Sequence, residues 1–526
     1  MPECRRVSIH RRELLRQLGG MLAYSWVADL AGCRDATSGA QADTQRAIRT
    51  EGPFLHGVAS GDPLPDSVVL WTRVTTGDAE HPPDEIDVQW QIARDEAFSS
   101  SLRQGVVRTS AARDHTVKVD ARGLDSGSTY YYRFRFDSHD SPVGRTRTAP
   151  RGTVERLRFA VACCSSYAHG YFHAYRAIAR RDDLDAVIHL GDYIYEYGDG
   201  EYGAVRPYDP PHEILTLDDY RRRFAHYRRD PDLQAVHLQL PMIAIWDDHE
   251  VANNAWQGGA ENHDPDAEGD FAVRKAAAMQ AYAEWMPIRD QPDGRCFRKF
   301  AFGDLLDLLL LDTRLWGRSQ QLVGPEDPSF ASDERSLLGA DQERWFADAM
   351  SGSEARWRAI AQQIMVGPMP LFFNADAWAG YPAARRRLLN VLEQHPNSVV
   401  LTGDVHSSWV LNLCADPYDS TVYDRETGRG AVAVEFVTPG ITSPGLDDAT
   451  AAAIEPMMRA EPHVGYAQLS RRGYMVIDID RDRIQATHWH FAAVDAATSP
   501  SEQRACVCSV RDGERAYRIE DASSGA

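Results

Sequence analysis

Residues 184–195 read LDAVIHLGDYIY, an apolar run that ends on Gly191 and Asp192. Tyr195 lies three residues beyond the aspartate. An apolar run of this length that stops at a glycine is typical of a buried strand. A single aspartate after a strand is usually a turn or helix-capping residue. The chain repeats this arrangement, however, and the repetition predicts both its fold and its chemistry.

Four apolar runs between residues 157 and 406 end on side chains that commonly bind metals. The other three are LRFAVACC (157–164), ending on Cys163 and Cys164; PMIAIWDDHE (241–250), which reaches Asp247, Asp248 and His249 and is followed by Asn253 and Asn254; and NSVVLTGDVH (397–406), which reaches Asp404 and His406. Ligands bind at the carboxyl ends of strands in open α/β sheets. We therefore expect all four endings to lie at one sheet edge. Helix capping alone would rarely place metal-binding residues at four strand endings, so we expect these residues to form a site.

The predicted strands alternate with helical stretches, for example 171–183 and 340–351. This alternation predicts a layered α/β domain over residues 155–495. Upstream, residues 53–148 contain short alternating segments separated by turn residues, which predict a small all-β sandwich of the immunoglobulin or fibronectin type. Residues 496–526 are polar and are expected to form a surface tail.

Residues 1–33 have the features of an export signal. They include the paired Arg11 and Arg12, then the short apolar stretch LGGMLAYSWVA, and they end on LAGC. This order is typical of a secretory signal, and the paired arginines favour the twin-arginine route. The LAGC ending resembles a lipobox, in which Cys33 would be lipidated.

Glu13 and Asp29 depart from the usual forms of these two motifs. The apolar stretch is nevertheless too short to span a bilayer, and its flanks fit export better than a buried N-terminal helix. Residues 34–52 are predicted to be a flexible tether. We therefore expect a protein exported to the periplasm or cell surface, with a lipid anchor at Cys33 as its only membrane contact.

The formal net charge of −20 argues against a surface that grips nucleic acids. An acidic protein of ordinary composition, 43% hydrophobic and 25% charged, is better suited to multivalent cations. The eight cysteines show no zinc-finger spacing. Cys163 and Cys164 are adjacent, and one residue separates Cys506 from Cys508, so the sequence defines no disulfide pattern.

The candidate site combines two kinds of metal ligand. Carboxylate and amide oxygens suit hard ions such as Ca²⁺, Mg²⁺ or Mn²⁺, whereas thiolate and imidazole suit a transition metal and phenolate favours Fe³⁺. Two ions that share a carboxylate can activate the water that attacks a phosphate ester. Asp192 is the candidate for the shared carboxylate. Tyr195, three residues later in the chain, can bind one of the ions that Asp192 binds.

Several segments resemble the PhoD-type alkaline phosphatases. They are GDYIYEYG (191–198), WDDHEVANN (246–254), LTGDVHSSW (401–409) and EFVTPGITSPG (435–445), with GVASGDP (57–63) and VVLWTRV (68–74) resembling the N-terminal domain of that family. The resemblance extends from about residue 53 to residue 495. It implies a four-layer α/β metallophosphoesterase core, in which a β-sandwich is flanked by helices. The small all-β sandwich precedes this core, and the enzyme is expected to be exported.

The same resemblance implies one Fe³⁺ beside Ca²⁺. It assigns Fe³⁺ to Cys164, Asp192, Tyr195 and His406, and it assigns Ca²⁺ to the shared Asp192 with Asp248, Asn253 and Asp404. Cys164 is preferred because CSSY (164–167) matches the family pattern, although the neighbouring Cys163 leaves this choice open. The implied reaction is hydrolysis of a phosphate ester by a metal-bridging hydroxide, without a protein nucleophile.

Three further features have both a catalytic and a structural interpretation. His249 could protonate the leaving oxygen or orient Asp248, or it could simply pack near the site. Arg314 follows the apolar run LLLLDTR and could hold a phosphate oxygen or form a structural ion pair. His488 and His490 alternate along a predicted strand, and could approach the site or merely share one face.

The sequence leaves the substrate open between phosphate monoesters and diesters, including small-molecule and lipid esters, because pocket shape decides between them. Residues 198–216, with Tyr202, Tyr208 and Pro210, are expected to form part of the pocket wall. A catalytically inactive, surface-binding lipoprotein is the alternative from another class, and the filled ligand positions argue against it. A two-metal amidase is disfavoured because such sites seldom combine Cys with Tyr.

Overall fold

The computed structural model describes residues 52–76, 83–291, 293–369, 373–498 and 500–522. The predicted export signal and all of the predicted tether except Gly52 lie outside this part of the chain. Within the described residues, no helix combines the length and the apolar character needed to cross a membrane.

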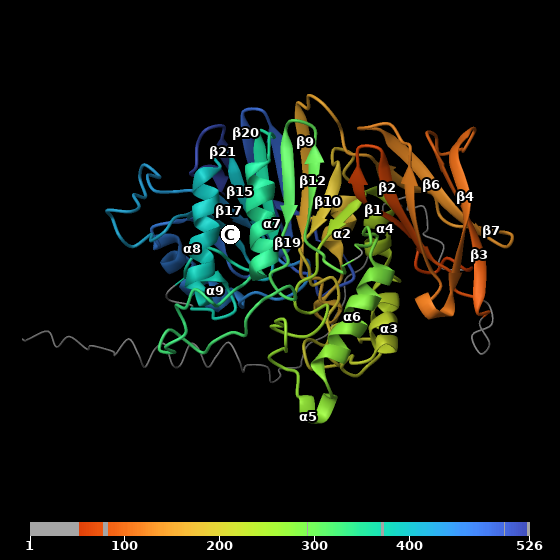
Figure 1. Cartoon of the computed structure of the whole chain (residues 1–526), viewed down its shortest axis with the longest axis horizontal. Helices are drawn as coiled ribbons and strands as arrows, with labels where there is room; N and C mark the ends of the chain where they lie inside the picture. Colours follow the sequence, from red (N-terminus) through yellow and green to blue (C-terminus); the bar gives the residue numbers. More distant parts are fainter. Residues whose placement is uncertain (1–51, 77–82, 292, 370–372, 499, 523–526) are drawn as a thin grey trace, which may run out of the picture.

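Two large β-sheets form the centre of the molecule (Figure 1). The larger has ten strands in the order β22 (Arg518–Ala522), β21 (Gln503–Arg511), β20 (Arg483–Phe491), β19 (Arg472–Asp480), β9 (Arg156–Ala162), β10 (Ala186–His189), β11 (Met242–Ala244), β1 (Val58–Leu64), β2 (Ser67–Arg73) and β5 (Thr116–Arg122). The central strands β9, β10, β11 and β1 are parallel, and antiparallel strands extend the sheet on both sides.

The second sheet has seven strands and a parallel centre. Its order is β12 (Arg298–Phe302), β13 (Leu306–Leu310), β14 (Trp357–Gln362), β15 (Ser398–Thr402), β17 (Ala433–Val437), β16 (Ser408–Leu413) and β18 (Val464–Gln468). Strands β13, β14, β15 and β17 are parallel and largely buried on both faces, which explains their predominantly apolar sequences.

Strand alternation divides the second sheet between two apolar cores. Leu308 and Leu310 join the core that the two sheets share, whereas Leu309 and Leu311 join the core beneath helices α7 (Gly339–Ser351) and α8 (Pro382–Gln394). Both helices lie over this sheet in Figure 1. A helix layer on an outer face of a sheet pair is the arrangement that the sequence predicted.

Helices on the other side of the molecule pack against the ten-stranded sheet. They are α2 (His173–Ala179), α3 (Leu217–Tyr227), α4 (Pro231–Gln239) and α6 (Phe271–Trp285), whose apolar side chains belong to the larger core. The remaining helices are α5 (Pro265–Glu268), α9 (Asp448–Ala460) and the 3₁₀ helices η1 (Ala111–Arg113), η2 (Tyr167–His169) and η4 (Trp378–Gly380). The four-layer metallophosphoesterase architecture is confirmed.

The predicted N-terminal sandwich is present, but it is not a separate body. Strands β3 (Glu85–Ala93), β4 (Ser101–Ser110), β6 (Thr129–Phe136), β7 (His139–Asp140) and β8 (Gly144–Arg147) form a five-stranded sheet. Its apolar face packs on β1, β2 and β5, which belong to the ten-stranded sheet. Gly61 permits this continuity, because a Cβ there would meet the carbonyl oxygens of Met242 and Pro287. The predicted boundary after residue 148 therefore divides two parts that share one sheet.

The prediction of a surface tail over residues 496–526 is wrong for most of that segment. Strand β21 pairs with β20, and β22 pairs with β21, so the segment forms one edge of the ten-stranded sheet. Residues 505–510 are buried. This short run, Ala-Cys-Val-Cys-Ser-Val, is enclosed by long polar stretches that dominate the local composition and concealed the strand.

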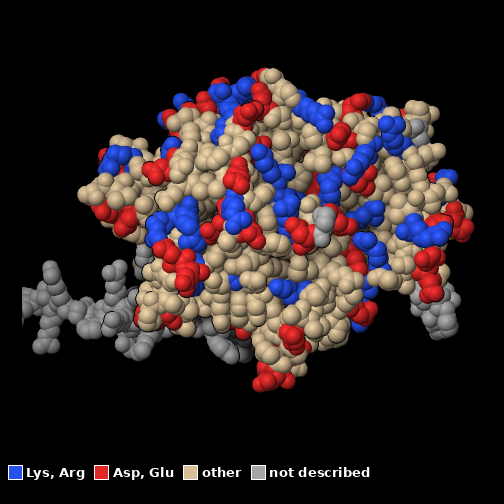
Figure 2. All heavy atoms as spheres, viewed as in Figure 1, with Lys and Arg blue, Asp and Glu red and all other residues tan. Residues whose placement is uncertain are grey.

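Basic and acidic side chains are interspersed over the face shown in Figure 2. Many exposed charged side chains of the described residues pair with each other, as Arg135 does with Asp140 and Arg108 with Asp87. Exposed pairs of this kind contribute little to stability. The charged groups that matter for function lie inside the molecule, at the ends of the central strands.

Candidate metal centre

The four predicted strand endings meet, but they come from two sheets. Strands β9, β10 and β11 are neighbours in the ten-stranded sheet, whereas β15 belongs to the seven-stranded sheet. The turn after β15 packs directly against the ends of β9 and β10, since a Cβ on Gly403 would lie 3.1 Å from Leu190 Cβ and 3.2 Å from Cys163 Cβ. The expectation of one shared sheet edge is therefore wrong, because the sequence does not show which strands pair.

Most of the predicted ligands on these turns have a strained backbone. Cys164, Asp192, Asp404 and His406 have φ values of 57°, 55°, 59° and 56°. Non-glycine residues seldom adopt this left-handed conformation, and such strain is concentrated at functional sites. The chain thus turns sharply after β9, β10 and β15, at an energetic cost that the surrounding packing offsets.

The first subsite contains Cys164, Asp192 and His406, whose ligand atoms all lie within 4.8 Å of one another. Tyr195 completes it, because its hydroxyl donates to Asp192 Oδ2 at 2.9 Å and lies 3.4 Å from His406 Nε2. Ser443 Oγ lies 2.5 Å from the same hydroxyl. The structure thus gathers all four side chains that were assigned to Fe³⁺.

The structure places Cys164, and not Cys163, at this subsite. Cys163 Sγ points instead towards the carbonyl oxygens of Thr438 and Pro439, at 4.0 and 3.7 Å. Cys164 Sγ, by contrast, lies within 4.8 Å of the ligand atoms of Asp192 and His406. Burial raises the pKa of the Cys164 thiol, and neighbouring Cys163 and Asp192 raise it further.

His406 is oriented as a ligand by its second ring nitrogen. Its Nδ1 lies 3.1 Å from the carbonyl oxygen of Pro444, so Nδ1 carries the proton and Nε2 faces the centre with a free lone pair. Burial lowers the pKa of His406 to about 3, with His249 and His169 adding to the effect. The neutral form that binds metals is therefore the stable one.

The second subsite is built from carboxylates. Asp247, Asp248 and Asp404 form one close group, and Asp192, Asp248 and His249 form another. Asp192 therefore belongs to both subsites, as expected of a bridging carboxylate. Burial raises the pKa of Asp404 to about 7 and raises that of Asp192 well above its usual value, with neighbouring carboxylates adding to the effect at both.

These carboxylates fit bound cations. Asp192, Asp247 and Asp248 are buried and Asp404 is partly buried beside them, and such crowding of carboxylates is unfavourable unless positive charge compensates them. Asp247 Oδ2 is buried and, within the part of the chain that the structure describes, has no hydrogen-bond partner. Hard oxygen donors on one side and a thiol, an imidazole and a phenol on the other form the two ligand sets that were predicted.

Asn253 lies on the turn that follows Asp248. Its backbone N–H donates to Glu196 Oε1 at 2.7 Å, and its side-chain amide lies 3.4 Å from Glu261 Oε2. The neighbouring Asn254 donates its backbone N–H to Asp248 Oδ2 at 2.6 Å. The turn thus supports Asp248, while the assignment of Asn253 to Ca²⁺ stays a prediction.

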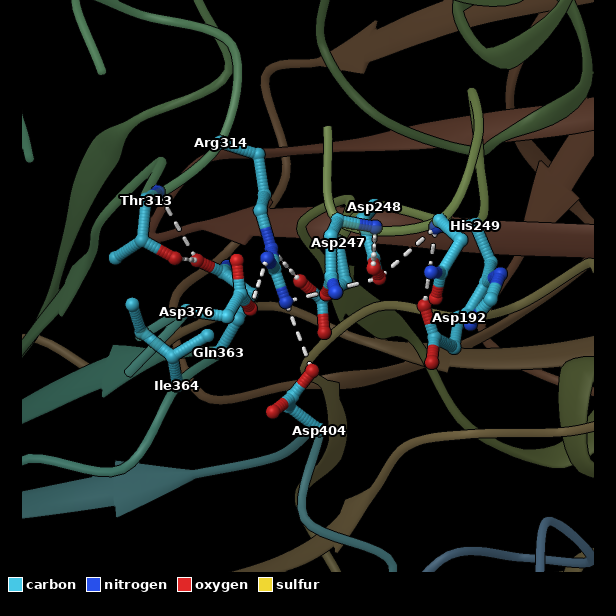
Figure 3. A network of polar contacts seen from close by, with 12 residues as sticks. Asp192, Asp247, Asp248, His249, Thr313, Arg314, Gln363, Ile364, Asp376 and Asp404 are labelled. Carbon is cyan, nitrogen blue, oxygen red and sulfur yellow. Dashed lines mark hydrogen bonds and ion pairs between the residues drawn. The ribbon is translucent and has the colours of Figure 1, made fainter. Parts of the chain in front are cut away.

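Arg314 is completely buried among four carboxylates (Figure 3). Its Nε donates to Asp247 at 2.5 Å, its Nη1 to Asp376 at 2.5 Å and its Nη2 to Asp404 at 2.8 Å. Asp248 lies 3.7 Å away. These contacts favour the structural interpretation of Arg314, and a phosphate contact stays a prediction.

His249 packs between the centre and an aromatic wall. Its ring stacks on that of Tyr195 with centroids 4.3 Å apart, and its Nδ1 lies 2.7 Å from Glu196 Oε2. Burial opposes the charged form, but Glu196, Asp248 and Asp192 outweigh it and raise the pKa of His249 well above its usual value. The imidazole can therefore hold a proton close to the metal ligands.

The predicted wall segment contributes to this arrangement. Tyr202 stacks on Tyr195 with ring centroids 5.5 Å apart, and it lies 6.1 Å from His249. Tyr208 is buried, and its hydroxyl lies 3.2 Å from Ser166 Oγ. Aromatic rings thus cover one side of the centre and exclude water from His249.

Sequence reasoning missed Glu250 and Glu196, which hold the ligands from behind. Glu250 accepts backbone N–H groups from Asp192, Tyr193 and Asp247 at 3.0, 2.6 and 2.7 Å. The signal was visible, since both glutamates lie inside the motif segments. From the sequence alone, however, a glutamate close to two aspartates is interpreted as a further metal ligand or as a solvent-exposed charge.

His488 and His490 lie outside this centre. Both side chains face the second sheet, where His488 Nε2 donates to the carbonyl oxygen of Val437 at 3.0 Å and His490 Nε2 lies 2.8 Å from Ser408 Oγ. The interpretation that they share one strand face is therefore confirmed.

Family models and known proteins give a consistent comparison. The model of the PhoD-like phosphatases matches residues 159–488, and the model of their N-terminal domain matches residues 39–150. Alkaline phosphatase D of Bacillus subtilis (strain 168) is 40% identical over 448 residues, which cover 80% of this chain and 75% of that protein.

Solved structures extend the comparison to the fold. The structure of PhoD aligns with a TM-score of 0.81 and 36% identity, covering 92% of this chain and 94% of that chain. Purple acid phosphatase PPD1 from yellow lupin (Lupinus luteus) seeds aligns with a TM-score of 0.53 and 11% identity, covering 85% and 73% of the two chains. At 11% identity this second similarity concerns the fold alone.

Proposed function

This chain belongs to the PhoD-like phosphatase family and is a phosphoric ester hydrolase, and we propose that it is an exported enzyme acting on phosphate monoesters. The observation that carries this proposal is the position of Asp192, which lies in both close groups of ligand side chains. A carboxylate shared by two cations is the arrangement that two-metal ester hydrolysis requires. The paired arginines and the LAGC ending of the N-terminal segment support export, with lipidation at Cys33.

We infer that the two subsites hold different ions. Cys164, Asp192, Tyr195 and His406 would hold Fe³⁺, for which thiolate, phenolate and imidazole are suitable ligands. Asp192, Asp248, Asn253 and Asp404 would hold Ca²⁺, which prefers oxygen ligands. When bound, the two cations would withdraw charge from the phosphoryl group and acidify water.

The protein's own residues orient the reaction and move a proton. Asp192 is fixed by the hydroxyl of Tyr195 and by the backbone N–H of His249, whose nitrogen lies 3.3 Å from Asp192 Oδ1. Glu196 fixes the imidazole of His249 through Nδ1 and favours its protonated form. His249 is thereby suited to protonate the leaving oxygen of the ester.

The proposal is tested with an aryl phosphate monoester and the matching diester, measured side by side at alkaline pH. Metal-loaded chain 34–526, the same chain after chelation and the Asp192→Asn variant are compared. We expect faster turnover of the monoester, which chelation and the substitution both abolish. A preference for the diester would instead favour a phosphodiesterase or phospholipase, and turnover of neither substrate would favour a binding lipoprotein.

A further inference from the structure

A second cluster of metal-binding side chains lies on the C-terminal strands and shares no residue with the Asp192 centre. It consists of His488 on β20 with Cys506 and Cys508 on β21. His488 and Cys506 are cross-strand partners, and Cys508 lies two residues further along the same face. The three ligand atoms lie within 4.8 Å of one another, and the three residues are 0%, 1% and 0% exposed.

The hydrogen bonding of His488 is that of a metal ligand. Its Nε2 must carry the ring proton, because Nε2 lies 3.0 Å from the carbonyl oxygen of Val437. Its Nδ1 therefore has a free lone pair, and this buried atom has no hydrogen-bond partner among the described residues. Ligating histidines usually donate their other N–H to a carbonyl or carboxylate in this way. A buried, unpartnered imidazole nitrogen is otherwise unfavourable.

The two cysteines are better arranged for a shared metal than for a disulfide. Both are free in the structure. Residues two apart in a strand have Cα atoms about 6.6 Å apart and parallel side chains, which lies near the upper limit for a disulfide.

We propose that His488, Cys506 and Cys508 bind a thiophilic metal ion, with Zn²⁺ as the ion expected. Two thiolates and one imidazole are the ligands that Zn²⁺ commonly uses, and soft donors exclude the Ca²⁺ of the catalytic centre. The ion would fasten β21 to β20 at the edge of the ten-stranded sheet. It would also fix the imidazole of His488, which donates to the carbonyl oxygen of Val437. The next residue, Thr438, contacts Cys163 Sγ through its own carbonyl oxygen.

The test begins from the full-length Cys164→Ser, Asp192→Asn protein, so that the catalytic centre contributes no thiolate ligand. This protein is stripped of metal and titrated separately with Zn²⁺ and Co²⁺. We expect one tightly bound equivalent of either ion, thiolate-to-cobalt charge-transfer absorption, and zinc X-ray absorption that fits two sulfur ligands and one imidazole. The spectrum identifies the ligands without any substitution in the new site.

Substitutions then locate the bound ion. Cys506→Ala with Cys508→Ala, and separately His488→Gln, should abolish the bound equivalent. Cys414→Ala, at a buried cysteine directly after β16, should retain it. In otherwise native protein, the Cys506→Ala, Cys508→Ala variant should still hydrolyse the phosphate ester, which shows that it folds.

Three results would overturn the proposal. The first is that the starting protein binds no stoichiometric metal through thiolates. The second is metal binding that survives the Cys506→Ala, Cys508→Ala change. The third is a Cys506–Cys508 disulfide in the freshly purified protein. Each of these results is independent of whether the catalytic centre hydrolyses phosphate esters.

Discussion

Glu250 joins Asp192 to the neighbouring strand ending through a single carboxylate oxygen. Its Oε2 accepts the backbone N–H of Asp192 at 3.0 Å and that of Asp247 at 2.7 Å, while its Oε1 accepts that of Tyr193 at 2.6 Å. Two of the turns that carry candidate metal ligands are therefore held at a fixed separation by one buried side chain. Burial raises the pKa of Glu250 to about 7.

Glu250→Gln should lower both metal affinity and activity. The amide replaces one acceptor oxygen by an NH₂ group, so at least one of three backbone N–H groups loses its partner, at a cost of about 1–3 kcal/mol. We expect metal affinity or kcat to fall roughly tenfold or more. Metal content and kcat at saturating metal measure the effect.

Glu435→Gln is the matched control, because Glu435 accepts the backbone N–H groups of Val366 and Gly367 in the other sheet. It should lose stability but keep its metals. Equal metal loss in both variants would show that Glu250 has no special role at the centre.

Asp192→Asn should remove activity and both metals together. An amide is a poor bridging ligand, and Asp192 is the only carboxylate in the described part of the chain that belongs to both the Cys164–His406 group and the Asp248–His249 group. Metal analysis of the purified variant and its phosphatase rate measure this. A variant that stays active with both metals bound would refute the bridging role.

Tyr195→Phe should abolish any visible phenolate-to-iron absorption of the purified protein. The change removes the oxygen but keeps the ring that stacks on His249. Tyr193→Phe is the matched control, since its hydroxyl contacts His237 away from the centre, at 2.8 Å. Absorption that persists in Tyr195→Phe would show that the colour has another source.

Arg314→Lys distinguishes the two interpretations of that residue. A structural role predicts destabilisation of about 3–5 kcal/mol, because a buried ion-pair cluster loses its fitted guanidinium. Urea unfolding measures the free energy of unfolding, and Arg298→Lys at the largely buried Arg298–Asp62 pair is the control. A raised KM with unchanged stability would instead indicate a phosphate contact.

Stability should fall in acid because His189 is buried in its neutral form. Gly191 N–H donates to His189 Nδ1, and His189 Nε2 lies 2.7 Å from the Tyr175 hydroxyl. Burial lowers the pKa of His189 to about 3 from its usual 6.5. Below pH 6.5 the unfolded chain binds a proton that the native state does not, so stability is lost as pH falls towards 3.

The expected slope is about 1.4 kcal/mol per pH unit for each such histidine. Urea unfolding at several pH values measures it. His189→Gln should flatten the curve between pH 6.5 and 3 relative to the native protein, whereas the exposed His139→Gln should leave it unchanged. Parallel curves for the native protein and His189→Gln would contradict the prediction.

The sequence by itself determined the ligand types, the strands that carry them and the layered α/β architecture. These follow from short-range patterns, since each apolar run and the polar residue that ends it lie within about ten residues of each other. The resemblance of four motifs to one family gave the class of reaction, and the family comparison confirmed a phosphoric ester hydrolase.

Only the tertiary structure decided how those pieces meet. It placed Asp404 and His406 on a second sheet, separated Cys164 from Cys163, and surrounded Arg314 with carboxylates up to 90 residues away in the chain. It also brought His488 on β20 against Cys506 on β21, a strand that the sequence presented as part of a tail. Strand pairing and buried electrostatics depend on contacts between distant residues, which no local pattern encodes.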